Sequence, residues 1–184
     1  VVNENFCKFE NKVKAMEAGI RTGLAYLTLG VVSSPLEGFV ELKLKKRKDG
    51  KEYFCLMYSG PIRSAGGTAG AFSVVIADYI RKNMGYDTYD ATEKEIRRMV
   101  TELYDYHERV TNLQYLPSEK EIRFLIKNLP VQIDGDPSEK IEVSNYKDLD
   151  RIETNQIRSG PCLVLGECVA QKASKLWNTM SAWS

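Results

Sequence analysis

The central stretch of the sequence reads Tyr58-Ser-Gly-Pro-Ile-Arg-Ser-Ala-Gly-Gly-Thr-Ala-Gly-Ala71 and joins an apolar strand pattern to an apolar helix pattern. Its glycines can adopt a positive φ or admit another backbone at close range. From Thr68 the apolar residues recur at three- and four-residue spacing, and Gly85 is placed to end the helix. The spacing predicts a helix whose apolar positions are Phe72, Val75, Ile76, Tyr79 and Ile80.

A glycine loop that ends at a helix start leaves backbone N–H groups pointing outward, where the helix dipole favours an anion. Arg63 can add a bidentate contact to the same anion. The loop is therefore either a phosphate site or a tight connection whose glycines serve packing only. Neither the Walker pattern nor G-x-G-x-x-G is present, so both interpretations stay open. The candidate phosphate-binding residues here are Arg63, Ser64, Gly66, Gly67 and Thr68.

The distribution of charge is uneven, although the net charge of the 184 residues is only +1. That balance excludes a uniformly basic nucleic-acid binder of the histone type. Residues 43–48 carry five positive charges and no negative one, whereas 87–108 and 134–153 each carry seven acidic and three basic residues. Any nucleic-acid contact is therefore expected to be local.

The basic segment 43–48 is expected on a β-hairpin. Apolar residues alternate with charged ones over 40–45, Asp49-Gly50 is a hairpin turn signal, and 53–58 is the returning strand. The lysines either protect an exposed sheet edge or contact nucleic acid. We favour the second interpretation, because the hairpin leads directly into the Arg63 loop and the two can form one positive surface. The candidate DNA-contacting residues are Lys43, Lys45, Lys46, Arg47 and Lys48.

The remaining pattern predicts an α+β fold, with helices packed on a small, mainly antiparallel sheet. A helix from Glu10 to about Gly30 contains Gly19 and Gly23, whose spacing indicates a closely packed neighbour. Two later helices begin at the capping boxes Thr92-x-x-Glu95 and Ser118-x-x-Glu121. The sequence is compatible with an extension of the first helix as far as Leu116. Short strands are expected at 131–133 and 141–143. We expect one domain over 10–178, with 1–9 as a tail or linker and 179–184 as a tail.

A second arginine-bearing turn is expected at Ile157-Arg-Ser-Gly160, which echoes Ile62-Arg-Ser-Ala-Gly66 and precedes an apolar helix through Leu176. Its position suits an anion in the same way. Arg158 and Ser159 are therefore added to the candidate phosphate-binding residues.

Catalytic and metal-binding patterns are missing from the sequence. The four cysteines, at 7, 55, 162 and 168, form no C-x-x-C pair, and His107 is the single histidine, which excludes a zinc ribbon or a histidine-based metal site. No nucleophile–base pair or paired carboxylates on a strand are found. No apolar run reaches the roughly 20 residues of a membrane span. The scattered cysteines are typical of reduced, buried thiols in a cytosolic protein.

Five blocks of sequence carry a resemblance to a known family: Arg21-Thr-Gly-Leu-Ala25, Gly30-Val-Val-Ser-Ser-Pro-Leu-Glu-Gly38, the stretch from Tyr58 to Ala69, Leu113-Gln-Tyr-Leu-Pro-Ser118 and Glu153-Thr-Asn-Gln-Ile-Arg158. In order and spacing they resemble the N-terminal region of the large subunit of archaeal family-D DNA polymerase. The resemblance extends from about residue 11 to residue 178.

The resemblance implies a fragment of a replicative DNA-directed DNA polymerase, a nucleotidyltransferase. The fragment alone is not expected to be active and holds no catalytic residue or metal, since the Mg²⁺ and Zn²⁺ sites are expected in the rest of the subunit. Implied partners are primer-template DNA, a small proofreading exonuclease subunit, the downstream domains of the large subunit and, through the full complex, a sliding clamp.

The family also implies a KH-like element, although no G-x-x-G stands at a helix–helix turn. A location in the archaeal cytoplasm, associated with the nucleoid, is implied as well, with no membrane partner. The alternative is a purely structural assembly module that binds other polymerase domains, the small subunit or a second copy of the chain, and no DNA.

Overall fold

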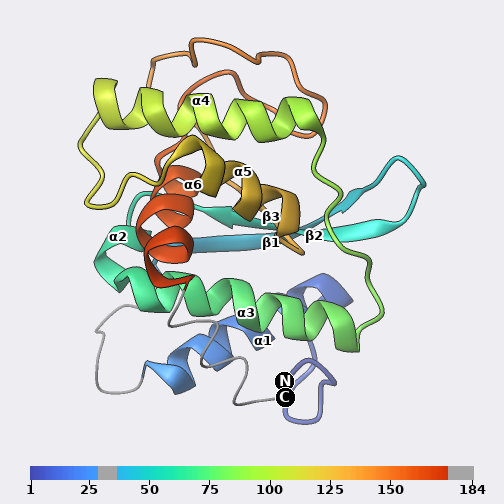
Figure 1. The fold of residues 1–184 in the computed structure, drawn as a ribbon. Coiled ribbons are helices and arrows are strands. Elements are labelled where there is room, and N and C mark those ends of the chain that lie inside the picture. The colour runs from blue at the N-terminus through green and yellow to red at the C-terminus, as the bar shows by residue number, and fades with distance from the viewer. Residues whose placement is uncertain (29–36, 174–184) are drawn as a thin grey trace.

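The structure of the chain is a computed structural model that describes residues 1–28 and 37–173. Figure 1 shows a small sheet with helices on both of its faces, α1 and α3 on one side and α4, α5 and α6 on the other. The expected α+β fold class is thereby confirmed. None of the described helices is long and apolar enough to cross a membrane. Gly30, Leu176 and the expected tail at 179–184 lie outside the described residues.

The sheet of the described residues has three strands in the order β1-β2-β3. β1 (Phe39–Lys46) and β2 (Glu52–Tyr58) form the expected antiparallel hairpin, with Lys43 opposite Cys55. β3 (Gln132–Asp134) pairs in parallel with β2, so the sheet is mixed rather than mainly antiparallel. The reason is that four helices, α2 to α5, separate β2 from β3, and a long crossover allows the strand to return in the parallel direction. Residues 141–143 contribute only an isolated bridge, between Glu142 and Gln156.

α1 (Lys12–Leu27) lies against α3 (Gly67–Asn83), as the glycine spacing predicts. A Cβ added at Gly23 would lie 3.2 Å from the side chain of Ile76, and one at Gly19 would lie 3.3 Å from Ile80. The two glycines therefore allow close packing within this chain, and their face of α1 is already covered by α3.

The buried face of α3 matches the predicted one only in part, since Ile80 is buried as expected. Tyr79 is 68% exposed, and Phe72 and Ile76 are half-buried, whereas the buried positions are mostly small. They include Ala69, Gly70, Ala71, Ser73, Val74 and Ala77. Only the three- and four-residue spacing had indicated the large apolar residues as the buried positions. Small residues are needed because α3 is packed closely, with a Cβ at Gly70 only 2.5 Å from the Cys168 sulfur.

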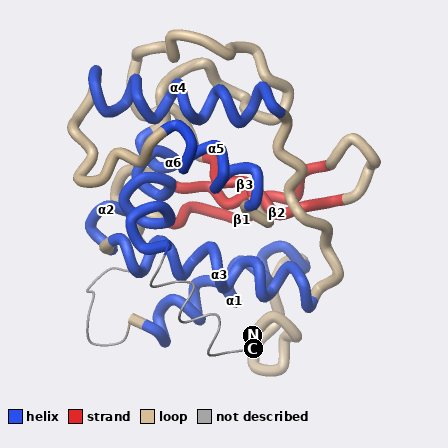
Figure 2. The backbone as a smooth tube through the Cα atoms, viewed as in Figure 1, coloured by secondary structure: helices blue, strands red, loops and turns tan. Residues whose placement is uncertain are grey.

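Both capping boxes are formed, at the starts of α4 (Glu93–Arg109) and α5 (Glu119–Asn128). α4 ends at Arg109, well short of Leu116. The short helix α2 (Ile62–Ala65) lies within the glycine loop, and α6 (Ser159–Leu163) continues into the π-helix η1 (Val164–Ala170). Figure 2 shows that the chain between β3 and α6 is a long loop passing beside α4.

Candidate nucleic-acid interface

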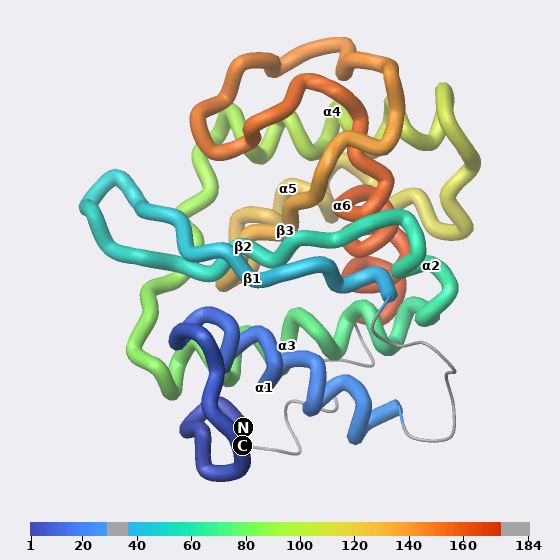
Figure 3. Tube along the Cα trace, turned by 180° about the vertical axis from the view of Figure 1, so that it is seen from behind, coloured from blue at the N-terminus to red at the C-terminus, as the bar shows by residue number. Residues whose placement is uncertain are grey.

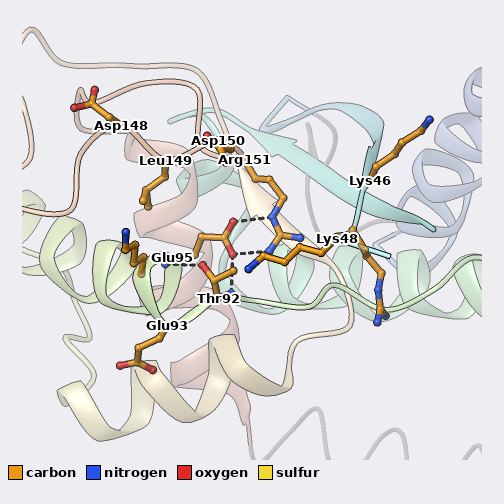
Figure 4. Close-up of a pocket in the computed structure, with 11 residues that line it drawn as sticks. Lys46, Lys48, Thr92, Glu93, Glu95, Asp148, Leu149, Asp150 and Arg151 are labelled. Carbon is orange, nitrogen blue, oxygen red and sulfur yellow. Dashed lines mark hydrogen bonds and ion pairs between the residues drawn. The ribbon is translucent and has the colours of Figure 1, made fainter. Parts of the chain in front are cut away.

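An open groove of about 670 Å³ lies between the hairpin turn, the start of α4 and a loop that follows β3. Three separate segments line it, and Figure 4 shows their side chains around the opening. The lining residues are Lys46, Arg47 and Lys48 from the hairpin, Thr92, Glu93, Lys94 and Glu95 from α4, and Asp148, Leu149, Asp150 and Arg151 from the loop.

Arg151 is fixed at the base of this groove. Its guanidinium donates hydrogen bonds of 2.8 and 2.7 Å to the two carboxylate oxygens of Glu95 and a further one to Asp90. It also lies 5.4 and 5.2 Å from the ring centres of Tyr53 and Tyr89, a cation–π arrangement. Burial lowers the pKa of Arg151, but Glu95 and Asp90 more than offset it, so the pKa is raised. Arg151 is therefore a structural cation that is not available to a ligand.

The first turn of α4 does not offer an anion site. The Thr92 hydroxyl accepts the N–H of Glu95, and the Glu95 carboxylate accepts the N–H of Thr92. Glu93 lies in the same turn, with its carboxylate paired to Arg97 and Arg123. A phosphate approaching here would meet carboxylates where unpaired N–H groups would otherwise be found.

The basic residues of the hairpin divide into paired and unpaired ones. Lys45 points inward and donates to Asp134 at 2.9 Å, and Lys43 lies 3.5 Å from Glu41. Arg47 donates to the carbonyl of Thr88 and lies within 4 Å of three carboxylates, those of Asp49, Asp87 and Asp90. Lys46 and Lys48, together with Lys94 of α4, are exposed and have no ion pair within the described residues. These three ammonium groups are the available positive charge around the groove.

The hairpin turn and the Arg63 loop do not form one surface. The seven residues of β2 separate them, so they lie at opposite ends of the sheet, as Figure 3 shows from behind. The expectation of a continuous positive surface is therefore wrong. Adjacency in sequence was misleading because an extended strand moves the chain by about 3.3 Å per residue, or roughly 20 Å over its length.

The Arg63 loop packs on the chain itself. The N–H groups of Ile62, Arg63, Ser64 and Gly66 all donate to carbonyls three residues earlier. Arg63 donates to the Glu167 carboxylate at 3.0 Å, with its side chain 37% exposed. Gly66 has a φ of +83°. Gly67 faces the backbone of η1, where a Cβ would lie 2.5 Å from the Glu167 carbonyl oxygen. Ser64 is exposed and Thr68 is half-buried at the first turn of α3.

Arg158 and Ser159 lie inside the protein. Arg158 is fully buried, paired with Glu102 and Asp134, and the N–H of Ser159 donates to the Ser138 hydroxyl at 2.8 Å. Burial lowers the pKa of Arg158, but Glu102 and Asp134 outweigh this effect and the pKa is raised. A phosphate contact by Arg158 is incompatible with this burial. The two arginine-bearing turns share Ile-Arg-Ser, but the arginine is exposed in the first and buried in the second.

Lys94 and Arg151 were not among the candidate residues from the sequence. The groove brings together three segments more than 40 residues apart, and no local pattern links them. Lys94 could have been noticed as a cation in the first turn of a capped helix, a position that favours acidic residues. Within residues 1–28 and 37–173, no group of three or more His, Cys, Asp or Glu side chains could hold a metal ion.

Comparison with known proteins identifies the family. The family model described as "DNA polymerase II large subunit DP2, N-terminal" matches residues 1–183. The chain belongs to this family. It is 53% identical over 175 residues to the DNA polymerase II large subunit of Nanoarchaeum equitans and 52% identical over 168 residues to that of Methanosarcina barkeri. The large subunit of Pyrococcus horikoshii is 46% identical over 178 residues. The resemblance found in the sequence is thereby confirmed.

The matches cover nearly all of this chain but little of each relative. They extend over 95%, 91% and 96% of the chain and over only 14%, 15% and 12% of the three large subunits, respectively. The chain therefore spans about one seventh of the length of the curated relatives that it matches.

Proposed function

We propose that this chain is the N-terminal region of the large subunit of a DNA-directed DNA polymerase and contacts the DNA backbone through the hairpin groove. The observation that carries the proposal is the set of three exposed, unpaired ammonium groups, Lys46, Lys48 and Lys94, around an open groove. No catalytic role is assigned to this region. Nucleotidyl transfer belongs to the full subunit, whose Mg²⁺ and Zn²⁺ sites we place outside these residues.

The shape and charge of the groove favour an extended polyanion over a small ligand. The opening is wide, and its cations lie at the rim, where phosphates of a DNA strand can reach them. Asp148 and Asp150 on the opposite wall repel phosphate, so the strand is expected to lie on the hairpin side. The contact is electrostatic and independent of sequence, which suits a polymerase that must act on any template.

The experiment measures the salt dependence of primer-template binding by the chain, using fluorescence anisotropy. Replacing Lys46 and Lys48 together by alanine should weaken binding equally for different sequences and reduce the salt slope by about one per lysine. The matched control is the double replacement of Lys8 and Lys140, which are exposed, carry the same charge and do not line the groove. A slope that is flat in the unmodified chain, or equal effects of both double variants, would reject the proposal.

The Arg63 loop is a weaker candidate for a second phosphate contact. Ser64 and Thr68 are accessible at its surface, but Arg63 must first exchange the Glu167 carboxylate for a phosphate. Replacing Arg63 by alanine is therefore expected to weaken DNA binding less than the Lys46 and Lys48 pair does. A larger loss would place the main contact at this end of the sheet.

The second candidate function is assembly without DNA contact. It is favoured by the internal pairing of Arg63, Arg158 and Lys45, which withdraws those cations from the surface. Its partners would be the downstream domains of the subunit, a small proofreading subunit and, in the full complex, a sliding clamp, in the cytoplasm beside the nucleoid. The Gly19 and Gly23 face cannot serve a second copy, because α3 occupies it. Calorimetric titration of the chain with the small subunit and with DNA separates the two functions. Heat on titration with DNA supports DNA contact, and heat on titration with the small subunit alone supports assembly.

A further inference from the structure

A basic stripe with an aromatic residue at its middle runs along the outer face of α5. Lys120, Phe124 and Lys127 are four and three residues apart, a spacing that places their side chains side by side on a helix. All three are exposed, and Phe124 is 67% exposed. Neither lysine has an ion pair within the described residues, so both charges are available to a ligand.

The stripe adjoins the hairpin groove. Phe124 and Lys127, with Arg123, form one wall of a smaller groove of about 340 Å³, which Ala91, Glu93 and Ile96 complete. Glu93 lines both grooves, so the two openings meet at the start of α4. Arg97 and Arg123 donate to the Glu93 carboxylate at 2.8 and 2.6 Å and hold its pKa below the ordinary value. The one acidic side chain shared by the grooves is therefore already neutralised.

The two acidic residues of α5, Glu119 and Glu121, do not cancel the charge of the stripe. Glu121 accepts hydrogen bonds from Ser118 in the capping box and from the Tyr115 hydroxyl. Glu119 lies 3.9 Å from Arg123. The lysines on either side of Phe124 keep their positive charge unopposed.

An isolated aromatic ring between cations fits a nucleobase better than a protein partner. The other large apolar side chains exposed among the described residues are Phe6, Tyr26, Leu27, Val40 and Tyr79, and none of them belongs to α4 or α5. Phe124 therefore has no large exposed apolar neighbour on α4 or α5, whereas large contiguous apolar patches are what mark protein interaction sites. Surfaces for single-stranded nucleic acid combine positive charge along the backbone with single aromatic rings on which bases stack.

We propose that α5 binds single-stranded nucleic acid, with a base stacked on Phe124 and the flanking phosphates held by Lys120 and Lys127. Arg123 borders the same groove and adds positive charge beside the stacked base. The inference rests on the proposed function in one respect, namely that the strand continues from the hairpin groove across Glu93 to α5.

The test measures binding of a fluorescent oligothymidylate and of a matched duplex to the 184-residue chain by anisotropy. Phe124→Ala should weaken oligothymidylate binding by about tenfold, with little effect on the duplex and none on the salt slope, because no charge is removed. Phe124→Trp should bind oligothymidylate more tightly than Phe124→Ala does. The new indole should also add a fluorescence signal, beyond that of the two native tryptophans, which can be quenched. Replacing Lys120 and Lys127 by alanine should reduce the salt slope for oligothymidylate by about 1.4, or about 0.7 per lysine.

The matched control is Tyr79→Ala, which removes an equally exposed ring from α3 on the other side of the sheet. Equal oligothymidylate affinities of Phe124→Ala and Tyr79→Ala would overturn the inference. Equal losses on single strand and duplex, or equally good competition by polyglutamate, would overturn it as well. The hairpin variant separates this outcome from the proposed function. If replacing Lys46 and Lys48 weakens duplex binding while Phe124→Ala changes nothing, the groove contact is supported and only the stacking is rejected.

Discussion

Arg158 and Glu102 are both fully buried and are joined by three hydrogen bonds. The backbone N–H, Nε and Nη2 of Arg158 donate to the Glu102 carboxylate at 2.8, 3.0 and 2.7 Å. Arg98, also fully buried, donates to the same carboxylate at 3.1 Å. One carboxylate therefore ties α4 to the start of α6, and its loss would leave two buried guanidinium groups without their shared partner.

Glu102→Gln is expected to destabilise the protein by about 3–5 kcal/mol, because removing one partner of a buried pair leaves an uncompensated charge. The control is Glu142→Gln, which breaks an exposed pair with Lys147 and should cost less than about 1 kcal/mol. Urea unfolding followed by circular dichroism measures both. Similar costs for the two variants would contradict the structural role of Glu102.

Glu95 and Glu121 occupy the same capping-box position in α4 and α5 but have different surroundings. Glu121 is exposed, whereas Glu95 is buried and also binds Arg151 and the Tyr89 hydroxyl. Glu95→Gln should cost about 2–4 kcal/mol and Glu121→Gln about 1 kcal/mol or less. The thermal midpoints of the two variants check this order, and similar midpoints would mean that capping alone determines the effect.

Gly160 lies against the backbone of the β2 end. A Cβ there would be 2.2 Å from the Tyr58 carbonyl oxygen and 2.8 Å from the nitrogen of Ser59, atoms that cannot move aside. Gly160→Ala should therefore destabilise the fold by about 3 kcal/mol or more. Gly50→Ala is the comparison, since its φ of +83° is unfavourable but its surroundings are open, for a cost of about 1–2 kcal/mol.

The four cysteines are predicted to differ sharply in reactivity. Cys7 is exposed, while Cys55, Cys162 and Cys168 are buried and reduced. Burial raises the pKa of all three buried thiols, that of Cys168 to about 12. Ellman's reagent at mildly alkaline pH should titrate one thiol in the native protein and four after denaturation. Reaction of a second thiol at the same rate as Cys7 would mean that the core opens readily.

Acid should weaken the network around Asp134. Burial raises the pKa of this carboxyl, but Arg158 and Lys45 lower it more, and the net pKa falls below its ordinary value. A depressed folded-state pKa stabilises the protein above the unfolded pKa of about 4, and this contribution is lost as the pH falls through the folded value. Unfolding free energies measured between neutral and strongly acidic pH should decline, and the decline should be smaller in Asp134→Asn.

Local signals in the sequence predicted the local structure well. The hairpin, both capping boxes, the end of α3 at Gly85 and the close packing at Gly19 and Gly23 were all predicted. Each depends on residues that are neighbours in the chain. The orientation of α3 was missed because tight packing required small residues rather than the largest apolar ones.

The candidate site was predicted only in part, since it depends on long-range contacts. Lys46 and Lys48 were named, but their partner Lys94 and the position of Arg151 follow from how three distant segments meet. Arg63 and Arg158 share a local sequence, yet one lies at the surface beside Glu167 and the other is buried on Glu102. Which way an arginine points was decided by carboxylates more than 50 residues away.

The carbonyl group of Tyr58 is a docking point for two segments that follow it much later in the chain. Gly135 and Gly160 both press against its oxygen, each at a distance that no larger residue could tolerate. Both segments therefore dock on the end of β2, which belongs to the hairpin. Synthesis from the N-terminus makes the hairpin sequence available before either of the segments that dock on it leaves the ribosome.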